Sequence, residues 1–180
     1  MANSAPYLES ERLKLMPLGL EHLSIDYVKW MNDPEIIAYL ETGGDYTIEK
    51  LKEFLTQIEK YPILFWAIHL KSTNKHIGNI KIDPVNLKHK YGEYGIMMGD
   101  KAEWGKGFAK EASQLVISYC FSVPLNLRKI NLGVYSENIS AIKLYKNLGF
   151  VEEGRYIKHV ITKKGYDDIL RMAIFNPSYE

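Results

Sequence analysis

Apolar and polar positions in the front third of the chain predict one strand followed by helices. Glu11–Met16 alternates leucines with charged residues, which is typical of a strand with one buried face. Leu20–Met31 is amphipathic at helical spacing, and Glu35–Leu40 predicts a shorter helical piece. A third helix is expected from the N-cap Thr47 to about Lys60.

The rest of the chain predicts strands interleaved with two helices. One helix begins at Phe108, and the other is capped by Asn138 and ends at Gly149. Alternating or wholly apolar runs predict strands at Leu64–Leu70, Ile77–Ile82, Glu93–Met98, Ile130–Val134, Phe150–His159 and Tyr166–Phe175. A strand–loop–helix–strand unit among antiparallel hairpins predicts an α/β fold with a mixed (α+β) sheet. The lack of repeats and linkers predicts a single domain over residues 1–180.

The most informative loop is Trp104–Ala109, where Gly105 and Gly107 flank Lys106 directly before the helix that begins at Phe108. A glycine-rich turn into a helix leaves several backbone N–H groups without partners and aimed in one direction. With the helix dipole, these groups favour an anion such as a phosphate, and glycine lets it approach the backbone. An ordinary loop is the alternative, because the segment is neither a Walker loop nor the three-glycine dinucleotide motif.

Composition narrows the classes of function. The formal net charge is +1 and the pI about 7.8, which gives no electrostatic reason to expect a nucleic acid or an anionic membrane as partner. No apolar run approaches a membrane span, and Met1–Arg12 lacks the apolar core of a signal peptide. The single cysteine, Cys120, is expected in the core and fits a reducing, cytoplasmic compartment. The histidines show no metal-ligand spacing, so no metal is expected.

A second motif spans Asn138–Phe150 and reads Asn-Ile-Ser-Ala-Ile-Lys-Leu-Tyr-Lys-Asn-Leu-Gly-Phe. It resembles the N-x-x-A-x-x-L-Y-x-x-x-G-F signature of the GCN5-related N-acetyltransferases, the GNAT superfamily. The Trp104–Ala109 loop is similar to the pyrophosphate loop of that family, although the family's first glutamine-type position is not evident here. Three further segments resemble the branch that holds the ribosomal-protein N-terminal alanine acetyltransferases and the spermidine acetyltransferases: Glu9–Leu13, Lys75–Ile80 and Tyr166–Met172.

The resemblance implies a GNAT-type acyl-CoA N-acyltransferase fold, with a mostly antiparallel seven-stranded sheet and flanking helices. Its two central strands, here Glu93–Met98 and Lys129–Tyr135, would splay apart around acetyl-CoA, the co-substrate. The diphosphate would bind the N–H groups of the Trp104–Ala109 loop, Phe108 included. The backbone N–H of Met97 or Met98 would contact the thioester carbonyl. The side chain of Asn138 would cap its helix and would also contact either the coenzyme or Tyr145.

The implied reaction is direct transfer of acetyl to a primary amine in a ternary complex. It needs a proton acceptor for the amine, donors for the oxyanion and a proton for the leaving thiolate. Tyr145 is the candidate acid, because the family often has a tyrosine near the CoA sulfur; packing in the core beside Ile142 and Leu148 is the alternative. Glu93 is the candidate base, directly or through water; a solvated or ion-paired strand carboxylate is the alternative.

The acceptor amine stays open. Acidic and aromatic residues mix between Trp30 and Tyr46, which suits a cationic amine, although a solvated acidic loop is the alternative. The acidic residues are Asp33, Glu35, Glu41 and Asp45. A protein N-terminus, a polyamine, a nucleotide-linked amino sugar and an antibiotic amine are all compatible, as is a homodimer through the apolar tail strands. A non-catalytic acyl-CoA-binding module is the alternative function, and the presence of Glu93 and Tyr145 argues against it.

Overall fold

The computed structural model describes residues 5–60 and 63–179, and their contacts form two compact units. The first unit comprises Met1–Pro84 with Gly95–Val116, and the second comprises Val85–Tyr94 with Ile117–Glu180. Three elements pass from one unit into the other: β4 (His76–Asn86), β5 (Tyr91–Met98) and α3 (Phe108–Phe121). The prediction made for Met1–Arg12 falls partly outside the described residues, because residues 1–4 are not among them.

The first unit is built on antiparallel strands. β1 (Leu8–Glu9), β2 (Leu13–Pro17), β3 (Leu64–Leu70) and β4 follow one another in hydrogen-bonded order. Within this unit the end of β5 joins β4, because the N–H of Gly99 donates to the carbonyl of Ile77 at 2.9 Å. The fully buried side chains of β2 and β3 are Leu13, Leu15, Trp66, Ala67 and Ile68.

The helices of the first unit are shorter than the sequence predicts. The expected helix over Leu20–Met31 is wrong as one element, since it consists of a 3-10 turn, η1 (Leu20–His22), and a separate α1 (Ile25–Trp30). The break occurs at Ser24, whose hydroxyl accepts a hydrogen bond from the Tyr27 N–H at 3.1 Å and so begins a new helix.

Two more elements complete this helical part. Glu35–Leu40 is reduced to the 3-10 turn η2 (Ile37–Tyr39), whereas α2 (Ile48–Ile58) follows the predicted N-cap Thr47. The apolar faces of α1 and α2 pack with β3 in one core cluster. Its buried members are Leu18, Tyr27, Trp30, Met31, Leu51, Leu55, Ile58 and Ala67.

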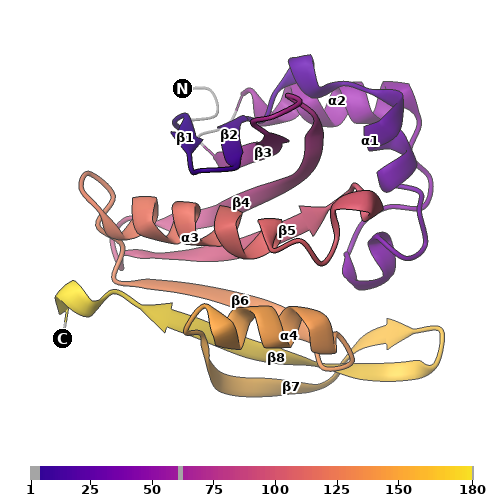
Figure 1. The fold of residues 1–180 in the computed structure, drawn as a ribbon. Helices are drawn as coiled ribbons and strands as arrows, with labels where there is room; N and C mark the ends of the chain where they lie inside the picture. Colours follow the sequence, from indigo (N-terminus) through magenta and orange to yellow (C-terminus); the bar gives the residue numbers. More distant parts are fainter. Residues whose placement is uncertain (1–4, 61–62, 180) are drawn as a thin grey trace. The chain divides into compact units, whose positions relative to one another are not determined.

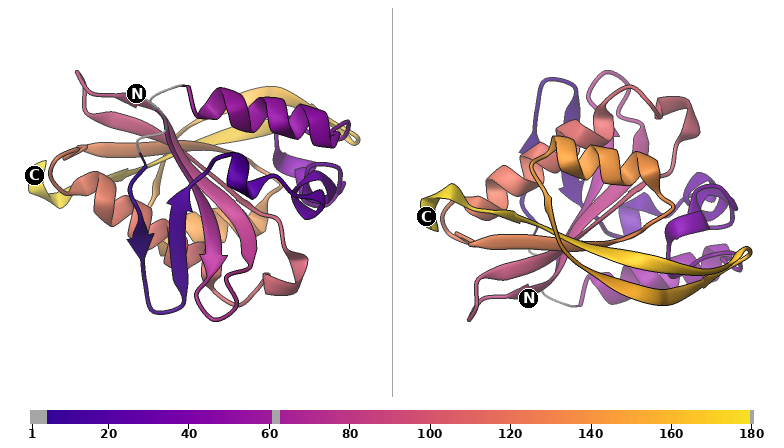
Figure 2. Two further views of the ribbon diagram at one scale, coloured as in Figure 1. Left: turned by 90° about the horizontal axis from the view of Figure 1, so that it is seen from above. Right: turned by 90° about the horizontal axis from the view of Figure 1, so that it is seen from below.

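The second unit contains the parallel pairing expected of a strand–helix–strand unit. The start of β5 pairs in parallel with β6 (Lys129–Tyr135), and Glu93 lies opposite Asn131. Beyond β6 the order is β8 (Gly165–Phe175) and then β7 (Val151–Thr162), both pairings antiparallel. Figure 1 shows α4 (Ile139–Asn147) lying along these strands, and the right panel of Figure 2 shows β7 and β8 as one long twisted hairpin.

The described residues contain eight strands, so the predicted count of seven is wrong by one. The additional strand is β1, a two-residue segment that pairs with β2 and is too short for an alternating pattern to be visible. The predicted mixed α/β sheet is confirmed by one parallel and several antiparallel pairings. Within residues 5–60 and 63–179 no helix combines the length and apolar character needed to cross a membrane. The single-domain assignment stays a prediction.

Candidate functional site

The Trp104–Ala109 loop lies in the first unit, between the 3-10 turn η3 (Lys101–Glu103) and α3. Gly105 and Gly107 both adopt left-handed backbone conformations, with φ of 74° and 85°. These conformations strongly favour glycine, because a Cβ would strain the backbone there. A Cβ on Gly105 would meet nothing within 4 Å, so backbone geometry rather than crowding accounts for glycine at this position.

The predicted contacts of the thioester lie beside this loop in the same unit. The indole Nε1 of Trp104 donates to the carbonyl of Met98 at 2.9 Å and so fixes the loop to the end of β5. Gly78 of β4 presses against the backbone of Met97 and Met98, and any side chain there would collide with the carbonyl of Met97. The backbone of Met97 and Met98 is therefore held in a fixed position.

Arg12 is a functional candidate that the sequence interpretation missed. It lies in the turn between β1 and β2, and its Nη1 donates to the carbonyl of Lys106 in the loop at 3.0 Å. Its Nε donates to Oε2 of Glu111, in the first turn of α3, at 2.7 Å. The guanidinium also lies 4.5 Å from the ring centroid of Phe108. The resemblance of Glu9–Leu13 to the family marked this segment without assigning it a role.

The acidic residues proposed for the acceptor are largely paired within the first unit. The Nζ of Lys101 lies 2.8 Å from a carboxylate oxygen of Asp33 and 2.7 Å from one of Glu35. Asp45 pairs with Lys50 at 2.5 Å. Three of the four predicted carboxylates thus already have lysine partners, which favours the alternative of a surface acidic loop.

Tyr145 lies in α4 of the second unit, and only 7% of its surface is exposed. Its ring makes an edge contact with Tyr94 at 5.6 Å and a tilted contact with Phe150 at 5.8 Å between centroids. Burial raises the pKa of Tyr145 to about 12, so the phenol stays protonated at neutral pH. As predicted, Asn138 caps this helix, because its Oδ1 accepts from the Ala141 N–H at 3.2 Å.

Glu93 lies in the second unit with its carboxylate engaged by two donors. Its Oε2 accepts from Nη2 of Arg171 on β8 at 2.8 Å, and also from Nδ2 of Asn131 on β6. The hydrogen bond to Glu93 raises the pKa of Arg171 above its ordinary value. Glu93 is thus placed as the ion-paired carboxylate of the alternative interpretation, and an incoming ammonium group would compete with Arg171 for it. Its role as a base stays a prediction.

A buried aspartate fixes the loop that leads into α4. Oδ1 of Asp167 on β8 accepts from the hydroxyl of Ser136 at 2.5 Å, and its Oδ2 accepts from the N–H of Glu137 at 3.2 Å. These residues precede Asn138 directly, so the start of the Tyr145 helix is tied to β8. The sequence carried no local signal for this contact, which joins positions 31 apart.

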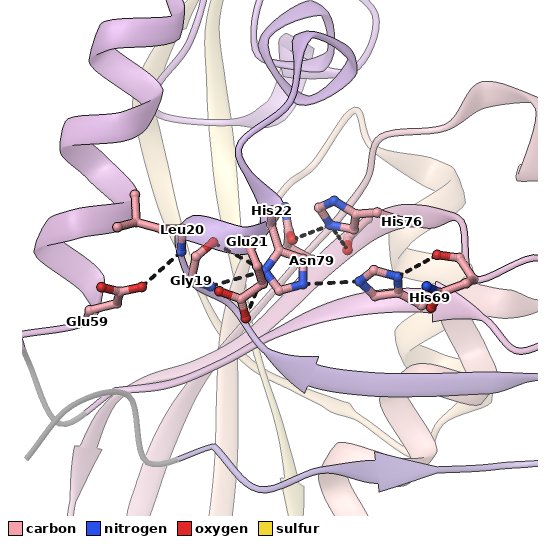
Figure 3. Close-up of polar contacts among 10 residues, drawn as sticks. Gly19, Leu20, Glu21, His22, Glu59, His69, His76 and Asn79 are labelled. Atoms are coloured by element: carbon pink, nitrogen blue, oxygen red, sulfur yellow. Dashed lines mark hydrogen bonds and ion pairs between the residues drawn. The ribbon is translucent and has the colours of Figure 1, made fainter.

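Three histidines, of which His22 and His69 are buried and His76 is half-buried, form a cluster in the first unit (Figure 3). His69 donates from Nδ1 to the carbonyl of Asn74 at 2.9 Å, which leaves its Nε2 as an acceptor. The Nε2–H of His22 fills that acceptor at 3.1 Å, and the Nδ1 of His22 then accepts from the N–H of Gly19 at 3.2 Å. Because the two Nε2 atoms face each other, one of them must lack a proton, so His22 and His69 cannot both be cationic.

The third ring, His76, stacks on His69 with 5.1 Å between centroids. Its Nε2–H points at Oδ1 of Asn79, 2.9 Å away. Burial lowers the pKa of all three histidines, and that of His76 to about 4. Among residues 5–60 and 63–179 no group of histidine, cysteine, aspartate or glutamate side chains is arranged to hold a metal ion.

Comparison with known families decides where the chain belongs. Residues 12–151 match the acetyltransferase (GNAT) domain, and this segment contains both sequence motifs. The chain is a GNAT acetyltransferase. Arg12, Glu93 and Tyr145 lie within the matched GNAT segment, whereas Asp167 and Arg171 follow it.

Related GNAT proteins match over most or part of the chain. The chain is 29% identical to the uncharacterized N-acetyltransferase p20 of Bacillus licheniformis, over 96% of this chain and 97% of p20. It is 36% identical to the spermidine N(1)-acetyltransferase of Vibrio cholerae, over 57% of this chain and 58% of that protein. The crystal structure of spermidine N-acetyltransferase from Vibrio cholerae in complex with CoA and spermine is similar, with a TM-score of 0.84, 27% identity and coverage of 94% and 99%. The GNAT fold is therefore shared along nearly the whole chain.

Proposed function

We propose that this GNAT protein transfers the acetyl group of acetyl-CoA to a primary amine by direct attack in a ternary complex. The observation that carries the proposal is the loop with Gly105 and Gly107 in left-handed conformations at the start of α3. Such a loop presents backbone N–H groups at a helix N-terminus, where a diphosphate is stabilised. The presence of CoA in the similar Vibrio cholerae structure supports this assignment.

The residues around the loop fit the coenzyme. Within the first unit, its diphosphate would lie on the N–H groups of Trp104–Ala109, and the backbone N–H of Met97 or Met98 would contact the thioester carbonyl. The contact of Asn138, in the second unit, rests on the family resemblance alone. Acetyl-CoA supplies an activated acyl group and a thiolate leaving group. Because the thioester is already activated, the protein has to position the amine and stabilise the charges that develop.

Tyr145 is proposed to stabilise the departing thiolate. A thiol has a reference pKa of about 8.5, which is ~3.5 units below the pKa of about 12 of the buried phenol. Complete proton transfer from Tyr145 to the sulfur would thus be uphill by ~5 kcal/mol. The phenol is better suited to donate a hydrogen bond that spreads the negative charge of the sulfur in the transition state.

Glu93 is proposed as the group that receives the ammonium proton, through water, with Arg171 and Asn131 holding the carboxylate in place. Glu93→Gln keeps the shape and removes the proton acceptor, so it should lower turnover about 10²-fold at neutral pH. Asp168→Asn is the matched control, because Asp168 is a carboxylate of β8 that pairs with a different arginine, Arg155 of β7. Turnover of the Glu93 variant that matches wild type at every pH would leave Glu93 as a structural ion pair only.

A small polyamine is the first acceptor to test, because proteins named as spermidine acetyltransferases are similar to this chain. The assay measures release of free CoA thiol from acetyl-CoA with spermidine, spermine, N-terminal peptides, amino sugars and aminoglycosides. Release of free CoA thiol that depends on the amine is expected with one of these classes of acceptor. Tight binding of CoA without thiol release from any amine would instead support a non-catalytic acyl-CoA-binding module. A homodimer stays a prediction that light scattering can check.

A further inference from the structure

Arg12 makes contacts that differ from those of an ordinary surface arginine. Half of its side chain is covered (45% exposed), and it bonds a carbonyl of the loop and a carboxylate of α3 at the same time. The partner Glu111 is more buried (18% exposed) and also accepts from the hydroxyl of Ser10 at 2.6 Å and the N–H of Arg12 at 3.1 Å. The turn between β1 and β2 is therefore fastened to the start of α3 by a network with several bonds.

The hydrogen bond from Arg12 to the carbonyl of Lys106 determines the orientation of the peptide unit between Lys106 and Gly107. In a trans peptide the C=O and the following N–H point in opposite directions. Because the carbonyl of Lys106 is turned towards Arg12, the N–H of Gly107 is turned away from Arg12. A Cβ on Gly107 would lie 3.6 Å from Nη2 of Arg12, so the guanidinium and this peptide are in close contact.

The positive charge of Arg12 is already balanced. Its Nη2 lies 2.5 Å from Oε2 of Glu111, and the pair carries no net charge. Without Arg12, the carboxylate of Glu111 would remain alone in the first turn of α3, close to where an anion would bind, and would repel it. Arg12 therefore serves the loop in two ways, by orienting a peptide and by neutralising a carboxylate.

We propose that Arg12 is a positioning residue for the coenzyme, which holds the Gly107 N–H towards the diphosphate and cancels the charge of Glu111. This inference rests on the proposed function, since it assumes that the loop binds CoA. In this proposed role Arg12 acts through the loop and not by contacting the diphosphate itself. The lysines of the loop region would act differently, because they would attract the negatively charged diphosphate from a distance.

The test compares two ligands, CoA and pantetheine, which lacks the phosphates, by calorimetry with wild type, Arg12→Ala and Arg12→Lys. Arg12→Ala should weaken CoA binding about tenfold, the scale of one charge-assisted hydrogen bond, and leave pantetheine binding unchanged. Arg12→Lys keeps the charge but not the planar fork that bonds two acceptors, so an intermediate loss for CoA alone is expected. This second variant also covers the case in which Arg12→Ala does not fold.

Lys110→Ala provides the charge control, because Lys110 is an exposed cation of the same helix. Its loss should weaken CoA binding at most about threefold, as for other exposed charges. Equal losses for CoA and pantetheine in the Arg12 variants, or unchanged CoA binding, would overturn the positioning role while the proposed function stands. Failure of the wild-type protein to bind CoA would overturn both.

Discussion

The histidine cluster of the first unit predicts that the protein loses stability in mild acid, before its carboxylates titrate. His76 is half-buried and packs against His22 and His69, and as a neutral ring it donates to Asn79. The perturbation is His76→Gln. The glutamine Nε2 can replace the histidine Nε2–H as the donor to Asn79, and the position no longer titrates.

The magnitude follows from the pKa of His76, which burial lowers from 6.5 to about 4. In the unfolded chain His76 takes up a proton below pH ~6.5, whereas in the folded protein it does so only near pH 4. Its contribution is therefore complete above pH ~6.5 and is lost as the pH falls towards 4. Between pH 7.5 and 5.0 this linkage removes about 2 kcal/mol of the free energy of unfolding. His22 and His69, whose pKa values are also lowered by burial, add to the loss.

The assay is urea unfolding followed by tryptophan fluorescence at several pH values from 7.5 to 5.0. Wild type should lose stability steeply, and His76→Gln should be less sensitive to pH by about 2 kcal/mol over this range. The matched control is His89→Gln, because His89 is exposed and its removal should leave the slope unchanged. A wild-type stability that is flat down to pH 5.0, or equal slopes for both variants, would refute the neutral-cluster interpretation.

Three further outcomes are expected. Tyr145→Phe should lower turnover about 10²-fold with little change in CoA affinity, and a variant of full rate would make Tyr145 a core residue only. Gly107→Asp should weaken CoA binding more than about tenfold by strain and repulsion of the diphosphate, and equal affinity in calorimetry would contradict the loop assignment. Gly165→Ala, which strains the hairpin turn between β7 and β8 at φ 118°, should leave CoA binding unchanged. Cys120, fully buried with a pKa raised by burial to about 12, should react with a disulfide reagent only after unfolding, and rapid native labelling would show that it is accessible.

The sequence predicts the long elements of this fold well, because their apolar periods extend over many residues. α2 begins after Thr47 and α4 after Asn138, as their capping side chains indicate. The incorrect predictions lie where a local hydrogen bond overrides the apolar periodicity, or where an element is too short to show a periodicity. The hydroxyl of Ser24 starts a new helix inside an amphipathic run, and β1 is too short to show any period.

The candidate site is predicted only in its local parts. The glycine loop and the Asn138 motif are contiguous in sequence, and each is visible without knowledge of the fold. The pairs that hold them are not contiguous: Arg12 and Glu111 are 99 positions apart, and Glu93 and Arg171 are 78 apart. Neither spacing nor composition relates such residues, so the ion pair of Glu93 and the support of the loop by Arg12 emerge only from the tertiary structure.

The contacts of Arg12 and Asp167 affect how the protein can be dissected. Arg12 steadies the entry to α3, and Asp167 steadies the entry to α4 from near the other end of the sequence. A fragment of residues 13–166 would retain every residue of both signature motifs, yet the turn before each helix would lose one of the side chains that hold it. Shortened versions of this enzyme that test inactive would therefore say little about the motifs themselves.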